Sequence, residues 1–172
     1  MVAKRKKKVG LLQGLTFSKQ MSLTTLMRVA MDLTSKAIFY YSITGNTKSL
    51  VEQTNTYDFD VINLQKTKPE EVNFNTYDTI LIGTPTIGDG IPPNVFKKIR
   101  DKLLSIEGKD IGLFGSGNSI YRYYCGALDL IEELLLHKNR IIFKFKFESY
   151  PTEKTKQEFQ MIIDRICKGG IK

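Results

Sequence analysis

Long hydrophobic runs are missing from this sequence of 172 residues. No apolar stretch approaches the roughly 20 residues that a helix needs to cross a bilayer. Even the richest runs, such as residues 37–43, have only the length of a strand. The sequence therefore does not predict an integral membrane protein.

Cysteine and histidine are also scarce. Cys125 and Cys167 are the only cysteines, and their spacing fits neither a zinc site nor a redox pair. Two thiols are too few for a disulfide framework, so a reducing compartment, the cytoplasm, is the simplest interpretation, and we expect both thiols to be buried and inert. His137 is the only histidine, which leaves no catalytic triad and no metal-binding cluster.

Positive charge is concentrated in one part of the chain. The sequence has 26 Lys and Arg residues against 18 Asp and Glu residues, a net charge of +8. Residues 1–35 hold seven of the cations and one acid, whereas residues 36–172 hold 19 cations and 17 acids. A basic protein suggests a nucleic acid or an anionic membrane as its partner. Here the basicity belongs to the first segment, and the rest of the chain is almost neutral.

The first 35 residues are predicted to be separate from the folded domain. They form either a basic, disordered tail or an extension upstream of the true start, because Met21, Met27 and Met31 lie shortly before the first expected strand. The basic run at residues 4–8 precedes an apolar stretch as in a signal peptide, but Gln13 interrupts that stretch, so secretion is not expected. Residues 36–172 have the length of one ordinary domain.

From residue 36 onward, short apolar runs alternate with segments of helical periodicity. The strand runs at 80–82 and 111–114 are apolar at successive positions, which is typical of parallel strands covered on both faces. Right-handed crossovers then predict an α/β fold, a doubly wound five-stranded parallel sheet with helices on both faces, whose ligand lies beyond the carboxyl ends of the strands. Strands are expected near residues 37–42, 59–63, 79–84, 110–115 and 140–147, and helices near residues 46–54, 93–105, 124–137 and 153–168.

Glycine-rich segments follow three of these strands, at residues 42–47, 84–90 and 115–119. The first segment offers several hydroxyls around Gly45, and a helix is expected to begin there. Free N–H groups and the positive end of the helix dipole favour a phosphate at such a point. The segment matches neither GxxxxGK[ST] nor GxGxxG, so a monophosphate is favoured over a nucleoside triphosphate or a dinucleotide. Taken alone, it also fits an ordinary capped helix.

Placed together in this order, the three segments resemble the flavodoxin family over about residues 36–168. Ser42, Thr44, Gly45, Asn46 and Thr47 match the family's [ST]xTGNT phosphate loop, and Thr84, Gly88, Asp89 and Gly90 match its TxxxGDG loop. The stretch from Phe114 to Leu135 resembles the family's second flavin loop, FGxGDSxYxxFCGAxDxIEExL. The resemblance implies non-covalent FMN and single-electron transfer in a protein that is not an enzyme. Its partners would be redox proteins, a flavodoxin reductase and an acceptor enzyme, with no nucleic acid and no membrane.

The resemblance also implies which residues contact FMN. The phosphate would lie in the first loop and the isoalloxazine between the other two, with Tyr121 stacked on the ring; an ordinary buried tyrosine is the alternative at that position. The expected contacts are Ser42, Ile43, Thr44, Gly45, Asn46, Thr47, Thr84, Pro85, Thr86, Ile87, Gly88, Asp89, Gly90, Gly115, Ser116, Gly117, Asn118, Tyr121, Tyr124 and Cys125.

Two departures from the family pattern bear on the flavin. Ile87 stands where flavodoxins commonly have an aromatic residue, so weaker FMN binding is expected. Asn118 replaces the usual Asp, and Arg122 adjoins the tyrosine expected to stack on the ring. Each acidic group disfavours the anionic hydroquinone by on the order of 1 kcal/mol. Because this chain has fewer acidic groups beside the ring, the potential of the semiquinone–hydroquinone couple should be higher than in acidic flavodoxins. In the family, the peptide corresponding to Gly88–Asp89 turns its carbonyl toward flavin N5, and glycine makes that turn sterically cheap.

Three functions remain open on the sequence alone. General electron transfer ranks first. Residues 145–166 also resemble the ribonucleotide reductase flavodoxin, NrdI, which assists assembly of the dimanganese-tyrosyl radical cofactor of class Ib ribonucleotide reductase; this role ranks second. The third possibility is a nucleic-acid-binding module that uses the basic tail and has lost its flavin. The intact loops argue against it.

Overall fold

Five parallel strands form one sheet in the order β2-β1-β3-β4-β5. The computed structural model describes residues 35–169, and the expectations for the basic N-terminal tail lie outside these described residues, apart from Ser35. The strands are β1 (Lys36–Tyr40), β2 (Asp60–Asn63), β3 (Thr79–Gly83), β4 (Asp110–Gly117) and β5 (Arg140–Glu148). The expected doubly wound parallel sheet is confirmed.

The central strands are buried on both faces, as their continuous apolar runs predicted. In β1, Ala37 and Phe39 belong to the core on one face of the sheet, and Ile38 and Tyr40 to the core on the other. This division follows from the alternation of side chains along a strand. Because each face of the sheet carries apolar side chains, each must be covered by helices.

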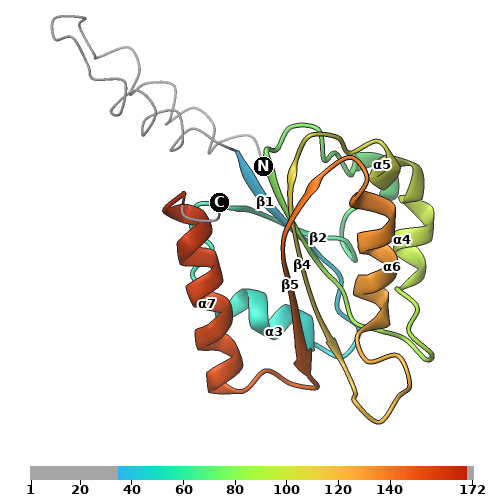
Figure 1. The fold of residues 1–172 in the computed structure, drawn as a ribbon, viewed down its shortest axis with the longest axis vertical. Helices are drawn as coiled ribbons and strands as arrows, with labels where there is room; N and C mark the ends of the chain where they lie inside the picture. The colour runs from blue at the N-terminus through green and yellow to red at the C-terminus, as the bar shows by residue number, and fades with distance from the viewer. Residues whose placement is uncertain (1–34, 170–172) are drawn as a thin grey trace, which may run out of the picture. The chain divides into compact units, whose positions relative to one another are not determined.

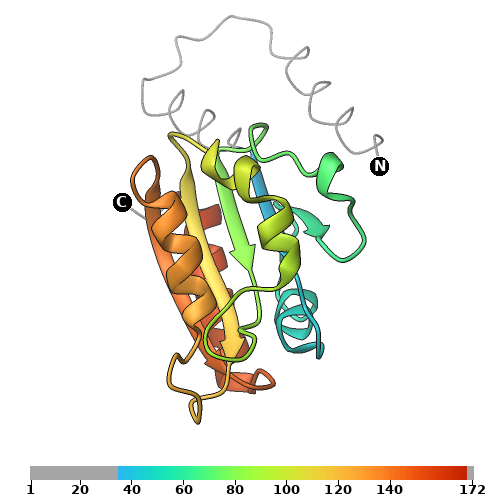
Figure 2. The same ribbon diagram turned by 90° about the vertical axis from the view of Figure 1, so that its right-hand side faces the viewer.

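Helices cover the sheet on both faces (Figures 1 and 2). On one side lie α4 (Asn94–Lys98), α5 (Arg100–Leu104) and α6 (Gly126–Leu135), and on the other lie α3 (Asn46–Glu52) and α7 (Glu153–Cys167). The side chains of these helices belong to the two separate cores, with Phe96 and Leu128 in one and Leu50 and Phe159 in the other. Among residues 35–169, no helix has the length and apolar character needed to span a membrane.

Two elements differ from the expectation. The helix expected at 93–105 is two short helices, α4 and α5, because Ile99 between them leaves helical geometry with φ −101° and ψ 14°. A 3-10 helix, η1 (Pro69–Glu71), was not expected. The Nζ of Lys102 holds the segment in place by donating hydrogen bonds to the carbonyls of Glu70 and Val72, at 2.7 and 2.8 Å.

The strand order creates a switch point between β1 and β3. The chain leaves β1 toward β2 on one side and leaves β3 toward β4 on the other. Right-handed crossovers in opposite directions place the following helices, α3 and α4, on opposite faces of the sheet. The loops after β1 and β3 therefore separate at the carboxyl edge, which is where ligands bind in folds of this kind, flavodoxin-like ones included.

Candidate functional site

The three glycine-rich loops meet at the carboxyl edge of the sheet. Strand register pairs Tyr40 with Gly83 and Gly83 with Phe114, so β1 and β3 end side by side, and β4 continues three residues beyond them to Gly117. Backbone hydrogen bonds continue from the strands into the loops: the N–H of Tyr41 donates to Gly83 at 2.9 Å, and the N–H of Thr86 donates to Ser116 at 3.0 Å. The structure thus brings together three segments that are spread over residues 42–119 of the sequence.

The first loop, residues 42–47, leads directly into α3. Gly45 is the residue before the helix and has φ 90°, a left-handed conformation that favours glycine. The buried hydroxyl of Ser42 accepts a hydrogen bond from the N–H of Lys48 at 3.1 Å. Ile43 and Thr44 are exposed at the tip of the loop. Ser42 therefore supports the loop from within, while the tip is accessible.

Two buried hydroxyls at this edge have no hydrogen-bond partner. They are the Oγ1 atoms of Thr47 in the first loop and Thr86 in the second, and no other side-chain nitrogen or oxygen of residues 35–169 is buried in this way without a partner. Leaving a buried hydroxyl unpaired costs about 1–3 kcal/mol. Both atoms lie in loops expected to contact a polar ligand. Phosphate and carbonyl oxygens would accept from them, so the residues present fit FMN.

The second loop, residues 84–90, is a tight turn closed by backbone hydrogen bonds. The N–H and carbonyl groups of Ile87 and Ile91 bond to each other in both directions, at 2.9 and 3.1 Å. Gly88 and Gly90 have φ 49° and 98°. Side-chain atoms at Gly88 would meet open space, whereas a Cβ at Gly90 would come within 2.8 Å of the Cβ of Tyr123. Thr84 and Pro85 are buried beneath the turn, while Ile87, Gly88 and Asp89 are exposed.

The third loop, residues 115–125, packs too tightly for side chains at its glycines. A Cβ at Gly115 would lie 2.1 Å from the carbonyl oxygen of Thr84, and one at Gly117 would lie 2.8 Å from the Sγ of Cys125. The Oδ1 of Asn118 accepts from the N–H of Ile120 at 3.0 Å and fixes the turn that follows. The requirement for close backbone approach explains the GSG pattern.

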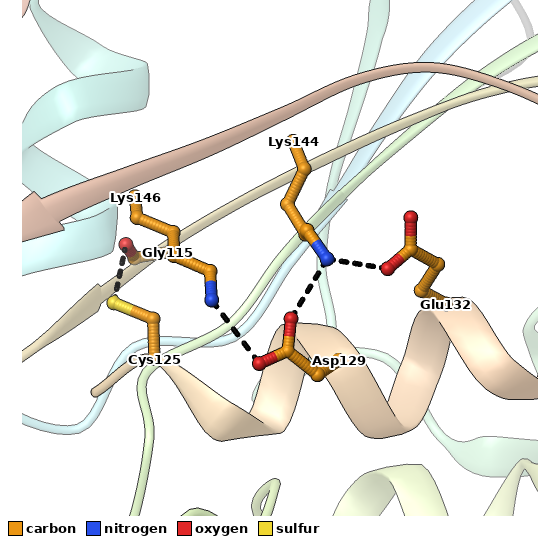
Figure 3. A network of polar contacts seen from close by, with 6 residues as sticks. All are labelled: Gly115, Cys125, Asp129, Glu132, Lys144 and Lys146. Carbon is orange, nitrogen blue, oxygen red and sulfur yellow. Dashed lines mark hydrogen bonds and ion pairs between the residues drawn. The ribbon is translucent and has the colours of Figure 1, made fainter. Parts of the chain in front are cut away.

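Tyr121 and Cys125 have opposite surroundings. Tyr121 is 51% exposed, so the alternative of an ordinary buried tyrosine does not describe it. Cys125 is fully buried and adopts φ 53° just before α6, with its Sγ 3.6 Å from the carbonyl oxygen of Gly115 (Figure 3). Burial raises the pKa of the Cys125 thiol. This thiol stays neutral and supports the loop from beneath.

Tyr124 and Arg122 complete the third loop. Burial is the main cause that raises the pKa of Tyr124 to about 12, so its hydroxyl keeps its proton at neutral pH. Arg122 lies over the ring of Tyr123, with 5.2 Å from Cζ to the ring centroid. The guanidinium therefore contacts Tyr123.

Exposed apolar side chains gather in and beside these loops. Half of the large hydrophobic side chains found exposed within residues 35–169 belong to this edge, namely Ile43, Ile87, Ile91, Ile120, Tyr121 and Tyr123. An accumulation of this kind usually marks a binding surface. Combined with the unpaired threonine hydroxyls, it suits a ligand with a flat apolar ring and a polar tail. No group of three His, Cys, Asp or Glu side chains in the described part of the chain could hold a metal ion.

A sequence model of the family described as "Flavodoxin" matches residues 38–157. The chain belongs to the flavodoxin family. Flavodoxins are electron-transfer proteins that carry FMN, so the family, the cofactor and the non-enzymatic class expected from the three loops are confirmed.

Individual flavodoxins are similar to this chain over about half of its length or more. "Probable flavodoxin 2" of Bacillus subtilis is 32% identical over 89 residues, which cover 49% of this chain and 59% of that protein. The flavodoxin of Maridesulfovibrio salexigens is 32% identical over 113 residues, which cover 60% of this chain and 77% of that protein. The chain thus spans about three fifths of the length of the first relative and about three quarters of the length of the second.

Solved structures share the fold. The crystal structure of oxidised Flavodoxin 1 from Bacillus cereus has a TM-score of 0.69 and 24% sequence identity, covering 78% of this chain and 98% of that one. The flavodoxin of Fusobacterium nucleatum, solved bound to flavin mononucleotide, has a TM-score of 0.62 and 19% identity, covering 80% of this chain and 99% of that one.

Sequence reasoning missed contacts that come from the end of β5. The carboxylate of Glu148 accepts hydrogen bonds from the N–H of Ser119, at 3.1 Å to each oxygen. The hydroxyl of Tyr150 accepts from the hydroxyl of Ser49 in α3 at 2.7 Å. The sequence does contain one signal, because β5 ends at the same edge as the three loops in a parallel sheet. None of the three glycine-rich motifs includes these residues.

Proposed function

We propose that this flavodoxin binds FMN in the three loops at the carboxyl edge and carries single electrons from a reductase to an acceptor protein. The observation that carries the proposal is the pair of buried, unpartnered hydroxyls of Thr47 and Thr86. They lie in two different loops, and each lacks the acceptor that a bound FMN would provide.

Different loops would bind different parts of FMN. Thr47, Asn46 and the backbone N–H groups after Gly45 would hold the phosphate without a cationic side chain, in keeping with anion binding at a helix N-terminus. Residues of the second and third loops, with Ile87 and Tyr121 exposed at their surfaces, would cover the two faces of the ring. Thr84, Pro85 and Cys125 are buried beneath these loops and would support them. The remaining residues expected to contact FMN stay predictions.

The flavin supplies the redox chemistry, and the protein sets its binding and electrostatics. Gly88 is exposed, has positive φ and has open space around its Cα. These properties leave the Gly88–Asp89 peptide free to turn its carbonyl toward the ring, which in the family favours transfer of one electron at a time.

The visible spectrum of freshly purified protein, with mass identification of any released flavin, tests the proposal. We expect a yellow protein that holds one FMN per chain. Titration of the apoprotein should show much weaker binding of riboflavin, because riboflavin lacks the phosphate. Equal affinity for the two flavins would contradict the assignment of the first loop.

A role in ribonucleotide reductase maintenance is the second candidate. It is supported by the short α3, with seven residues, and by β5, which runs from Arg140 to Glu148 as one strand. Such a protein would deliver reduced or oxygen-derived species to the dimanganese small subunit. Radical formation in that subunit, measured with and without the reduced flavodoxin, separates this role from general electron transfer. We place both activities in the cytoplasm, supported by the free cysteines Cys125 and Cys167.

A further inference from the structure

Three consecutive residues at the end of β5 contact different parts of the candidate flavin site. They are Glu148, the last residue of β5, and Ser149 and Tyr150, which follow it; together we call them the β5–α7 turn. Glu148 accepts from the N–H of Ser119 in the third loop, and the N–H of Ser149 donates to the carbonyl of Gly117 in the same loop at 3.0 Å. Tyr150 reaches across to α3. The turn therefore joins the third loop to the helix that follows the phosphate loop.

We propose that the β5–α7 turn is a positioning strap for FMN, in which Glu148 tunes the potential of the ring and Tyr150 orders the phosphate loop. The inference rests on the proposed function, since both effects act on bound FMN. It adds a determinant that none of the three glycine-rich loops contains.

The backbone of the turn is held in an unusual conformation. Ser149 has φ 49°, and it is one of two residues other than glycine with positive φ in the described part of the chain. The left-handed region is unfavourable for residues with a Cβ, and such strain persists where the surroundings determine the conformation. Here the hydrogen bond from Ser149 to Gly117 fixes the backbone between the two side chains that make the contacts.

Glu148 places a carboxylate against the third loop, in which the usual acidic residue is absent. Asn118 stands where the family usually has Asp, and the Glu148 carboxylate is bound to the N–H of the next residue, Ser119. A hydrogen bond from an N–H to a carboxylate is stronger than one between neutral groups. The nearby cation Lys146 is already paired with Asp129, at 3.1 Å. The carboxylate of Glu148 therefore lies against the loop that is proposed to cover the ring, where its charge would oppose the negative charge that full reduction adds.

Tyr150 contacts α3, the helix that follows the phosphate loop. Its hydroxyl accepts hydrogen bonds from the hydroxyl of Ser49 at 2.7 Å and from the Nε2 of Gln53 at 3.3 Å. These two bonds lower the pKa of the Tyr150 hydroxyl. Ser49 is buried in α3, two residues beyond Thr47, whose unpaired hydroxyl lies in the phosphate loop. The contact thus fixes the middle and the end of α3 relative to the turn.

Two single variants separate the two effects. Glu148→Gln keeps the shape of the side chain and removes its charge. We expect the equilibrium constant for the second one-electron reduction of the flavin to increase about two- to fivefold. This corresponds to a rise of about 20–40 mV in the lower one-electron potential, at about 59 mV per tenfold change. The shift should appear with FMN and with riboflavin alike, and it should shrink at high salt.

Tyr150→Phe removes only the hydroxyl that meets α3. It should weaken FMN about two- to fivefold in a titration of the apoprotein, with little effect on riboflavin and on the potentials, because riboflavin lacks the phosphate. Glu158→Gln is the matched control for charge: this half-exposed carboxylate lies on α7, outside the three loops, and pairs with Lys154 at 3.8 Å. It should change neither the potentials nor the affinity.

The outcomes distinguish the strap from the proposed function. If the wild-type protein fails to bind FMN, the proposed function and the strap both fail. If it binds FMN but Glu148→Gln leaves both potentials at their wild-type values, or shifts them no more than Glu158→Gln does, the tuning role is wrong. Equal weakening of FMN and riboflavin by Tyr150→Phe would overturn its assignment to the phosphate loop.

Discussion

The hydroxyl of Thr47 is buried without a partner. We therefore expect Thr47 to strengthen ligand binding and to lower the stability of the protein without ligand. Thr47→Val keeps the shape and removes the unpaired hydroxyl. We expect FMN affinity to fall by about 1–3 kcal/mol, while the free energy of unfolding of the apoprotein stays level or rises. Asn46→Leu should weaken FMN by a similar amount. Flavin titration and urea unfolding of the apoprotein measure the two quantities.

Thr54→Val is the matched control for this prediction. The buried hydroxyl of Thr54 donates to the carbonyl of Leu50 at 2.7 Å within the segment that follows the phosphate loop. Its removal should lower the stability of the apoprotein and leave FMN affinity unchanged. If Thr47→Val behaves in the same way as Thr54→Val, the Thr47 hydroxyl has no role in binding.

Asn118 and Arg122 supply a prediction about the potential. The double change Asn118→Asp with Arg122→Glu restores acidic charge in the third loop, and the new carboxylate would still accept the hydrogen bond that Asn118 now takes from Ile120. We expect the lower one-electron potential to fall by tens of millivolts, since about 59 mV corresponds to a tenfold change for one electron. Spectroelectrochemical titration at two ionic strengths measures it, and screening should reduce the shift at high salt. An unchanged or raised potential would mean that these side chains do not act on the flavin.

The residues of the site could be predicted from the sequence only where a short motif reflects the backbone conformation or the close packing of the same segment. The glycines of the three loops belong to this group, because positive φ at Gly45 and close packing at Gly117 depend on neighbouring backbone. Glu148 and Tyr150 do not, because their contacts join distant segments: Tyr150 and Ser49 are 101 residues apart in the chain. Charge pairs and hydroxyl contacts over such separations leave no pattern in a single sequence.

At the scale of elements, β5 and α6 are joined by an ion-pair cluster. Lys144 pairs with Asp129 at 2.7 Å and with Glu132, and Lys146 also pairs with Asp129 (Figure 3). Burial alone raises the pKa of Asp129, but the hydrogen bonds from Lys144 and Lys146 outweigh it and hold the pKa below its ordinary value of 3.8. The cluster attaches the edge strand to the helix that covers it.

This lowered pKa predicts how stability depends on pH. A carboxylate whose pKa is lower in the folded state stabilises the protein above its unfolded pKa, and the stabilisation is lost as the pH falls through the folded pKa. Asp129→Asn should therefore reduce the free energy of unfolding above about pH 5 and converge with wild type in stronger acid. Because Asp129 is half exposed, we expect an effect of about 0.5 kcal/mol. Denaturant unfolding across this pH range measures it, and a constant difference at every pH would contradict the ion-pair explanation.

The type and order of the elements could be predicted because buried parallel strands are apolar at successive positions, as at Ile80, Leu81 and Ile82. Their ends could not be predicted as closely. Strand β4 continues to Gly117, past the expected end at residue 115, because glycines without side chains let it pack against Thr84 and Cys125. The break at Ile99 and the 3-10 helix at Pro69–Glu71 depend on tertiary contacts, such as the one from Lys102, that local periodicity does not contain.

At the scale of the whole molecule, the boundary at residue 35 can be tested by truncation. The hydroxyl of Ser35 donates to the carbonyl of Thr76 at 2.8 Å, and its N–H donates to the carboxylate of Asp78 at 3.1 Å. A chain that begins at Ser35 keeps these contacts and should fold and retain its flavin, with most of the excess positive charge removed. Thermal unfolding and flavin content of the purified protein measure this. Loss of FMN or aggregation would show that residues 1–34 belong to the folded domain.

The exclusively parallel pairing of the described strands also determines the order in which the sheet can form. Parallel neighbours cannot arise from a hairpin, because each pair needs a crossover between its strands. Strand β1 pairs only with β2 and β3, with Lys36 opposite Thr79. During synthesis at about 5–20 residues per second, its apolar side chains therefore wait several seconds for their partners to leave the ribosome. A strand that is buried along its whole length in the native protein is therefore the first of the described strands to emerge, and it has no neighbour to pair with when it does.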